Sequence, residues 1–375
     1  MRKMLELQST QIEAVLASHR ILARVWGGIV TPRFVRFQLT TPMGTRIQQV
    51  TRLADEIAMA LGSRSARVYR KDGAIQVEVP REEQRVVRLA TVSEGLDEVP
   101  EMTAILGLDE EGRPLLVRLS SPDVGHVLVS GTTGSGKTAL VRTMLLSLAE
   151  HNGPQGVQMV LIDPHGRGFG SLRGLPHLMV PIIREVGRAE EVLAKLVAEM
   201  ERRDRLGHVV PRIVLGIDEL ADLMQVGGRG LGDALERLTQ RGRKAGVHVV
   251  ACTQKPTVAV LGSLVKANFP LRLVGSVASV EDARVGAGCG GTGAEKLLGR
   301  GDFVLVNKGD VVRFQGAWAE EAEIVQRVRE VGERRQVGDR VRPVERVPGG
   351  RYEAPALALQ DRVRSLGRVG AGGVA

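Results

Sequence analysis

The sequence predicts an α/β protein built on a mainly parallel sheet and preceded by a small α+β domain. Between about residues 106 and 317, short aliphatic runs alternate with longer segments of helical periodicity, as in successive βαβ units. The segment GTTGSGKT at 131–138 is a complete G-x-x-x-x-G-K-[ST] phosphate loop. It follows the aliphatic run VLVS at 127–130 and precedes apolar residues at helical spacing, so the motif stands in the strand, loop and helix setting that it requires.

Residues 1–100 are predicted to form the small α+β domain, because apolar and polar residues alternate in short stretches around one helical pattern. The turn Lys71-Asp72-Gly73 separates two such stretches and indicates a β-hairpin. The expected strands are 33–39, 66–69 and 74–79, and the expected helix is 49–61.

Residues 101–330 are predicted to form a RecA-like P-loop NTPase domain. Its aliphatic runs are short and are each followed by loop or helix signals, which is typical of buried parallel strands. Functional groups should therefore gather at the carboxyl ends of these strands. The expected strands are 126–130, 157–162, 212–217, 247–252 and 271–275.

The phosphate loop assigns chemistry to all eight of its residues, because its glycines let the backbone curl around a phosphate and point amide groups inward. Lys137 is expected to reach the β- and γ-phosphates, and Thr138 offers a hydroxyl to Mg²⁺. The phosphates would lie at a helix N-terminus, which favours anions. The predicted ATP-binding residues are Gly131, Thr132, Thr133, Gly134, Ser135, Gly136, Lys137 and Thr138.

Two further predicted strands are followed by polar residues of the kinds that ATPases use to hydrolyse ATP and to sense the γ-phosphate. The run RIVLGI at 212–217 leads into Asp218 and Glu219, an apolar strand ending in two acids as in a Walker B motif. Asp218 is expected to orient the Mg²⁺ shell and Glu219 to polarise the attacking water. The run at 247–252 leads to Gln254, whose amide would lie beside the γ-phosphate and sense hydrolysis.

Composition limits the classes of partner. The 375 residues include 52 Lys and Arg against 43 Asp and Glu, a net charge of +9 that suggests a polyanion or lipid head groups. Aromatic residues are only 3%, which disfavours a reader that stacks single-stranded bases. The two cysteines are far apart, so neither a disulfide framework nor a zinc site is indicated.

Hydropathy and the C-terminal composition bear on location. No stretch has the roughly 18 apolar residues of a membrane span, and the N-terminus lacks the apolar core of a secretory signal, so a cytoplasmic protein is expected. Residues 331–375 are rich in Arg, Gly and Pro with little periodicity and are expected to form a basic, flexible tail.

Four segments occurring together and in order resemble the FtsK/SpoIIIE family of DNA translocases. They are MERRDRL (200–206), IDELADLM (217–224), AGVHVVACTQKP (245–256) and KANFPLRL (266–273). Residues 30–90 also look like the small α domain that precedes this family's RecA-like β domain. The resemblance implies a hexameric ring that threads double-stranded DNA through its pore and hydrolyses ATP at subunit interfaces.

The resemblance also implies two sets of basic residues. Hydrolysis at an interface needs a cation from the neighbouring subunit, and Arg272 and Arg284 both stand where the family carries arginines, which leaves the choice open. The segment with Arg241, Arg243 and Lys244 matches the family's basic segment near the pore, and Arg229 in a glycine-rich loop is a second candidate. Arg272 and Arg284 could each instead form a surface or intrachain salt bridge, and the basic cluster could be a solvated helix face.

Two differences from the family and two rival functions remain. Larger members carry an N-terminal membrane anchor and a C-terminal winged-helix module, for which this chain is not expected to have room. His165 stands where relatives usually show Lys. The rival functions are a protein-secretion ATPase of the same superfamily and a nucleotide-gated DNA-binding protein that uses ATP only to assemble.

Overall fold

The computed structural model describes residues 2–31, 34–71, 73–81, 86–254 and 268–336, which divide into two compact units. The first unit comprises Met1–Val87 together with Glu110–Arg113, and the second comprises Arg88–Asp109 and the chain from Pro114 onward. Residues 88–100, predicted with the first domain, group with the second unit, because Leu89 N donates a hydrogen bond to Trp318 O (3.0 Å).

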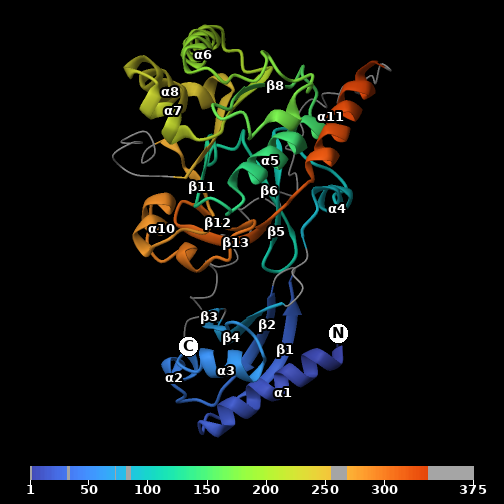
Figure 1. The fold of residues 1–375 in the computed structure, drawn as a ribbon, viewed down its shortest axis with the longest axis vertical. Helices are drawn as coiled ribbons and strands as arrows, with labels where there is room; N and C mark the ends of the chain where they lie inside the picture. The colour runs from blue at the N-terminus through green and yellow to red at the C-terminus, as the bar shows by residue number, and fades with distance from the viewer. Residues whose placement is uncertain (1, 32–33, 72, 82–85, 255–267, 337–375) are drawn as a thin grey trace, which may run out of the picture. The chain divides into compact units, whose positions relative to one another are not determined.

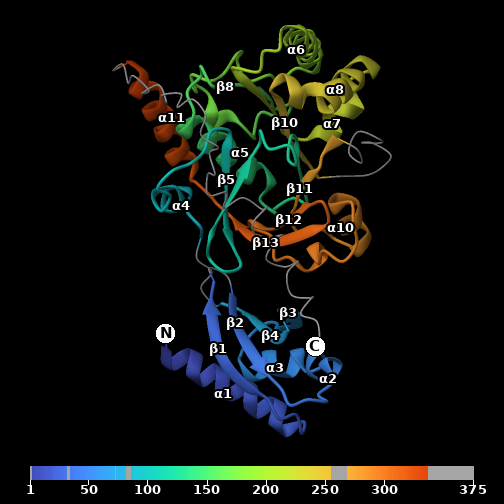
Figure 2. The same cartoon turned by 180° about the vertical axis from the view of Figure 1, so that it is seen from behind.

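The first unit is a four-stranded antiparallel sheet in the order β1-β2-β4-β3, covered by helices (Figures 1 and 2). Its elements are α1 (Arg2–Ser18), β1 (Arg24–Val30), β2 (Phe34–Thr40), α2 (Ile47–Thr51), α3 (Ala54–Ala60), β3 (Arg67–Lys71) and β4 (Ala74–Pro80). The three strands expected here are confirmed as β2, β3 and β4. Lys71 pairs with Ala74 across the expected hairpin, whose residue Asp72 lies outside the described residues.

Three features of this unit differ from expectation. The sequence analysis did not predict α1 and β1. The single helix expected over 49–61 is divided into α2 and α3, because Leu53 N donates to Val50 O (3.1 Å), a bond to the third preceding residue that ends the first helix. The core of the first unit lies between the sheet and the helices, where Phe37, Val77 and Ile12 are fully buried.

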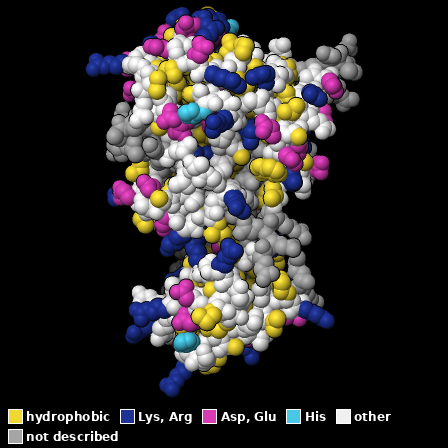
Figure 3. Space-filling model, in the orientation of Figure 1, with side chains coloured by type: hydrophobic (Ala, Val, Ile, Leu, Met, Phe, Trp, Pro, Cys, Tyr) yellow, Lys and Arg dark blue, Asp and Glu magenta, His cyan; other side chains and the backbone are white. Residues whose placement is uncertain are grey.

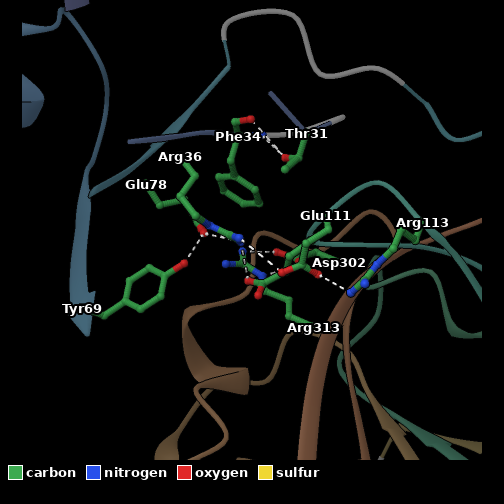
Figure 4. A network of polar contacts seen from close by, with 10 residues as sticks. Thr31, Phe34, Arg36, Tyr69, Glu78, Glu111, Arg113, Asp302 and Arg313 are labelled. Atoms are coloured by element: carbon green, nitrogen blue, oxygen red, sulfur yellow. Dashed lines mark hydrogen bonds and ion pairs between the residues drawn. The ribbon is translucent and has the colours of Figure 1, made fainter. Parts of the chain in front are cut away.

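A buried arginine holds the polar part of the first unit together (Figure 4). Arg36 on β2 forms ion pairs with Glu78 (3.6 Å), Glu110 (3.1 Å) and Glu111 (3.7 Å), the last two from the short segment that groups with this unit. Tyr69 donates to Glu78 Oε2 (3.2 Å), and burial together with Glu78 raises the pKa of Tyr69. The buried guanidinium is therefore compensated by several carboxylates.

The second unit is built on one nine-stranded sheet in the order β6-β5-β13-β12-β11-β7-β10-β9-β8 (Figures 1 and 2). Its strands are β5 (Thr103–Asp109), β6 (Pro114–Arg118), β7 (Val127–Ser130), β8 (Val157–Ile162), β9 (Arg212–Ile217), β10 (Val247–Thr253), β11 (Leu271–Val274), β12 (Asp302–Asn307) and β13 (Asp310–Gly316). The α-helices are α4 (Leu89–Glu94), α5 (Lys137–His151), α6 (Val186–Leu206), α7 (Leu220–Val226), α8 (Arg229–Arg241), α10 (Val280–Ala287) and α11 (Glu321–Gln336). Its described residues also form three short 3-10 helices: η1 (Gly170–Leu172), η2 (Gly242–Ala245) and η3 (Ala294–Lys296).

The α/β fold class is confirmed, but the sheet is mixed rather than mainly parallel. The five expected strands are β7 to β11, and they pair with one another in parallel. The other four strands, β5, β6, β12 and β13, add an antiparallel half that was not predicted. Their residues are less uniformly aliphatic, as the charged and polar positions of DVVRFQG in β13 illustrate.

Helices cover both faces of the parallel strands. Alternate residues of β9 point to opposite faces: Leu215 and Ile217 belong to the core that α6 and α8 complete, whereas a Cβ at Gly216 would meet Leu145 of α5. Nearly all apolar residues of α5 are buried, so this helix is central to the unit. α11 continues to Gln336, past the predicted start of the tail, and residues 337–375 lie outside the described residues.

The pairing of β5 with β6 shifts register between Ile105 and Gly107. Substitution of Gly107 tests how closely β5 packs against the chain around Gln315. The φ of Gly107 is +147°, and a Cβ there would collide with the carbonyl oxygen of Gln315 and lie 2.7 Å from Ala317 N. We expect Gly107→Ala to lower the free energy of unfolding by about 3 kcal/mol in urea denaturation, because it combines backbone strain with overpacking.

Gly187→Ala provides the matched control for that experiment. Gly187 lies in α6, and a Cβ there would meet no atom within 4 Å. Alanine should leave stability unchanged or raise it by up to about 1 kcal/mol. Equal unfolding free energies for wild type and Gly107→Ala would contradict the packing described for β5.

Candidate nucleotide site

The phosphate loop joins β7 to α5, and its neighbours in space are the ends of the two next strands. Ser130 at the end of β7 pairs with Thr253 of β10, and Ala251 of β10 pairs with Ile217 of β9. Asp218 and Glu219 therefore follow one neighbouring strand, and Gln254 follows the other. This is the grouping that the sequence predicted for the carboxyl ends of the parallel strands.

The loop needs glycine at its first and sixth positions. Gly131 has φ +148°, and a Cβ there would lie 2.8 Å from Ser135 Oγ and 3.2 Å from Ser276 O. Gly136 has φ +99°, and a Cβ there would lie 3.0 Å from Gly301 N. Both residues combine a left-handed backbone with close approach of another chain segment, which only glycine tolerates without strain.

Residues from the loops after β11 and before β12 hold the phosphate loop from outside. Thr132 donates from both its backbone N and its hydroxyl to Ser276 O, at 2.8 and 3.0 Å. Arg300 N donates to Gly134 O (3.1 Å), and Gly301 N donates to Ser135 O (2.8 Å). The sequence analysis did not predict these contacts, since no local pattern links the loop to residues more than 140 positions away.

The loop's two reactive side chains contact the site directly. Lys137 Nζ donates to Thr132 O (3.0 Å), and Thr138 Oγ1 donates to Asp218 Oδ1 (2.9 Å). Lys137 is 6% exposed and Asp218 9%. Burial lowers the pKa of Lys137 and raises the pKa of Asp218, so both charged forms are poorly solvated. The charges of Glu219 and Asp218 partly offset the effect of burial on Lys137.

Glu219 has a strained backbone and a firmly held carboxylate. Its φ is +61°, an uncommon value for a residue other than glycine, and its side chain is 6% exposed. Oε1 accepts from Thr253 Oγ1 (3.2 Å) and from Gln254 N (3.0 Å). Burial raises the pKa of Glu219, while these hydrogen bonds favour the ionised form.

Gln254 connects the strand end to the loop. Its amide oxygen accepts a hydrogen bond from Thr133 Oγ1 (2.7 Å), and its backbone N donates to Glu219. The structure therefore brings together the predicted hydrolytic acid, the predicted sensor and the phosphate loop.

Asp163 is an acidic residue of the site that the sequence analysis left without a role. It follows β8, and its Oδ2 accepts from Gly168 N (2.9 Å) and Phe169 N (3.0 Å). Its Oδ1 is buried without a hydrogen-bond partner in the described part of the chain. Its charge contributes to the raised pKa of Asp218, and a Cβ at Gly168 would lie 2.8 Å from Asp218 Cγ. The signal was present, because an apolar strand ending in Asp also preceded Asp218.

The two arginines proposed to act across an interface differ in exposure. Arg272 on β11 is 7% exposed and donates to Phe269 O (3.3 Å) and Val285 O (3.4 Å), and burial lowers its pKa. Arg284 on α10 is exposed. His165, which stands where relatives usually show Lys, is also exposed. Its Nε2 lies 3.0 Å from Asp222 Oδ2.

The four predicted DNA contacts lie at or just after the ends of α8, and all are exposed. Arg241 donates to Asp204 Oδ2 (2.9 Å), and Arg243 donates to the carbonyl oxygen of Pro122. Lys244 follows in η2, and Arg229 is the first residue of α8. Two of the four thus make contacts within the chain, and all four lie at the surface, as the alternative of a solvated helix face also expects.

The phosphate loop follows β7, and the two acids follow β9, which is separated from β7 only by β10. This arrangement defines a P-loop NTPase. Comparison with known families makes this specific. The FtsK/SpoIIIE family matches residues 85–208 and 204–258, and the FtsK alpha domain matches residues 1–81. The chain belongs to the FtsK/SpoIIIE family.

Curated relatives carry the names of that family. The chain is 33% identical over 360 residues to the DNA translocase FtsK of Staphylococcus aureus (strain Mu50 / ATCC 700699), covering 87% of this chain and 45% of the relative. It is 33% identical over 348 residues to the DNA translocase SpoIIIE of Bacillus subtilis (strain 168), covering 84% of this chain and 44% of the relative. The chain thus spans about half the length of these relatives.

Solved structures share the fold. The pCW3 conjugation coupling protein TcpA, solved with ATPγS, has a TM-score of 0.60 at 18% identity, over 87% of this chain and 99% of that one. The cytoplasmic domain of the type VII secretion ATPase EccC of Thermomonospora curvata has a TM-score of 0.56 at 24% identity, over 64% of this chain and 32% of that one. Among the described helices, none has the length and apolar character of a membrane span.

Proposed function

We propose that this chain is an ATP-driven translocase of double-stranded DNA that works in the cytoplasm. The observation that carries the proposal is Glu219, a buried carboxylate fixed by Thr253 and Gln254 beside a complete phosphate loop. Fixing such a group beside a nucleotide serves hydrolysis, whereas binding alone does not require it. The relatives named DNA translocases supply the cargo.

ATP and Mg²⁺ fit the residues present. Within the described residues, no group of three or more His, Cys, Asp or Glu side chains could hold a metal by itself. Thr138 Oγ1 and Asp218 Oδ1, 2.9 Å apart, are hard oxygen donors, which suits Mg²⁺ bound through one or two protein groups together with phosphates and water. When bound, the ion would neutralise phosphate charge.

The remaining chemistry belongs to residues of the chain. Lys137 would neutralise the β- and γ-phosphates, for which its buried ammonium group is placed. Glu219 would hold and polarise the water that attacks the γ-phosphate, and Gln254 would sense the phosphate, since it already contacts Thr133 of the loop. The shared contact between Glu219 and Gln254 N couples the two roles.

Glu219→Gln tests hydrolysis directly. The amide keeps the size of the side chain but loses the charge that polarises water, so we expect ATP turnover to fall about 10² to 10⁴-fold while ATP binding persists. Turnover and nucleotide affinity should be measured on the same preparation, with exposed Glu191→Gln on α6 as the control. Wild-type protein without any turnover would favour the nucleotide-gated assembly protein instead, and undiminished turnover in Glu219→Gln would contradict the assigned role.

A ring of subunits, six by the family resemblance, would complete the site with a cation from a neighbour. Arg284 is the better candidate for this residue, because it is exposed, whereas Arg272 is buried and donates to carbonyl groups within its own chain. We propose that Arg284 acts across the interface and that Arg272 stabilises the loop before β11.

Mixing two inactive variants tests this assignment. Lys137→Ala removes the phosphate contact, and Arg284→Ala removes the proposed trans cation, so each variant alone should have little activity. Mixed rings contain some interfaces with both residues intact, and we expect ATPase activity to rise above that of either variant. No recovery in rings verified to be mixed would exclude action from different subunits, and full activity in Arg284→Ala alone would exclude the role itself.

DNA is favoured over polypeptide as the cargo. The similarity to the DNA translocases covers 87% of the chain and includes the FtsK alpha domain, whereas the fold shared with the secretion ATPase covers 64%. On the visible face, Lys and Arg side chains are interspersed with Asp and Glu rather than gathered in one patch (Figure 3). We therefore assign DNA contact to local groups, Arg229, Arg241, Arg243 and Lys244, acting on phosphates without reading sequence.

Displacement of a DNA triplex strand tests translocation. We expect the chain to displace the third strand from a linear duplex with ATP and not without it, and duplexes of different sequence should bind equally at fixed salt. Binding should weaken steeply with salt, because phosphate contacts release counterions. Absence of DNA stimulation and of salt-sensitive duplex binding, in protein that hydrolyses ATP, would favour the secretion alternative.

A further inference from the structure

A small hollow with a basic lining lies at the opposite end of the strands that carry the nucleotide site. It has a volume of about 180 Å³, and we call it the basic hollow. Its polar lining includes His126, Gln240, Arg241, Arg243, Lys244 and Asn268. His126 precedes β7, whereas the phosphate loop follows it. A strand of four residues is about 13 Å long, so the two sites are well separated.

His126 presents a buried N–H group that makes no hydrogen bond of normal geometry among the described residues. The side chain is 3% exposed, and its Nδ1 accepts a hydrogen bond from Val249 N (3.0 Å). In the neutral ring the proton must then be on Nε2. Nε2 is buried and makes no hydrogen bond of normal geometry within the described chain, although the backbone of Thr239, also in the lining, lies close enough to favour the protonated ring. A buried donor without a well-placed acceptor is uncommon in folded proteins, so a better acceptor in the hollow would stabilise it.

The neighbouring residues hold His126 in this state. Burial, followed by the effects of His248 and Arg243, lowers the pKa of His126 to about 3. Burial lowers the pKa of His248 to about 4, and its Nδ1 donates to Gly125 O (2.9 Å). His126 is therefore a neutral donor at physiological pH.

Arg243 supplies positive charge that is itself fixed in place. Its aliphatic part packs against Gly125, where a Cβ would lie 3.2 Å from Arg243 Cδ, and its guanidinium donates to Pro122 O. That bond uses one of five N–H groups, which leaves a fork suited to phosphate oxygens. Lys244 adds an exposed ammonium group, and Arg241 is also in the lining although it pairs with Asp204.

We propose that the basic hollow is a second phosphate-binding site, in which His126 Nε2, Arg243 and Lys244 donate to the oxygens of one phosphate group. Donors from the residue before β7 and from a 3-10 helix line the same hollow, and several donors around one space suit a tetrahedral oxyanion. The phosphate could belong to a DNA backbone or be free in solution. If the phosphate belongs to DNA, the inference rests on the proposed function, and the hollow would bind one phosphate of the DNA backbone at a fixed position.

The binding of inorganic phosphate tests the site without requiring translocation. Radiolabelled phosphate is dialysed to equilibrium against the full chain, with the phosphate loop saturated by a non-hydrolysable ATP analogue and Mg²⁺. We expect one phosphate per chain, with affinity at least ten-fold lower in Arg243→Gln and reduced in Lys244→Gln. Arg237→Gln is the matched control, because Arg237 lies on α8, is exposed, pairs with Glu201 and is not in the lining.

His126→Asn tests the buried donor separately. Asn can still offer an oxygen near the position of Nδ1 for Val249 N but has no group at the position of Nε2, so phosphate binding should fall while the thermal midpoint stays close to that of wild type. If His126→Asn does not fold, the Arg243 and Lys244 variants decide. No phosphate binding by wild type, or equal losses in Arg243→Gln and Arg237→Gln, would overturn the proposal.

A short DNA duplex added to the same dialysis distinguishes the two sources. Displacement of phosphate by the duplex, together with weaker duplex binding by Arg243→Gln, supports a backbone phosphate as the occupant. Phosphate binding that the duplex does not alter supports a site for free phosphate. Because neither result requires movement of DNA, failure of the triplex assay would leave the phosphate site standing.

Discussion

The carboxylate of Glu219 is the point on which the nucleotide site depends. It follows β9, yet it accepts hydrogen bonds from Thr253 and Gln254 at the end of β10. The left-handed backbone at Glu219 turns the side chain toward that neighbouring strand. The burial of the group raises its pKa, so the hydrogen bonds are needed to keep the ionised form favourable. Local strain is thus compensated by contacts that also fix the geometry.

The loops after β11 and before β12 have a direct part in this site. The segment before β12 donates Arg300 N and Gly301 N to the phosphate loop, and the segment after β11 accepts from Thr132 through Ser276 O. The phosphate loop therefore contacts the strand ends and also the loops after β11 and before β12. Because an enclosed backbone loses little further entropy on binding phosphates, the site is preorganised for them.

The sequence predicted those parts of the site that are local in the chain. The phosphate loop, Asp218, Glu219 and Gln254 each follow an aliphatic run, and such runs are visible without a structure. The antiparallel strands were missed because their residues mix polar and apolar types on a sheet with helices on part of its surface. Ser276 and Arg300 act through long-range backbone contacts, which leave no local pattern, whereas Asp163 follows an aliphatic run and could have been found by the same signal. The burial of Arg272 also depends on tertiary packing, so sequence alone treated it and Arg284 alike.

The charges around the loop explain why one chain would be half of a working site. Asp163, Asp218 and Glu219 contribute three buried carboxyl groups, whereas Lys137 is the buried cation that the described residues bring to the loop. The phosphates of ATP would add further negative charge in a poorly solvated place. A divalent ion and a guanidinium from outside the chain would restore the balance, since transfer of a phosphoryl group is driven mainly by positioning and charge stabilisation. Arg284 is exposed and could therefore reach the site of a neighbouring subunit, where the negative charges exceed the positive ones. This match of charges is the physical reason to expect a ring.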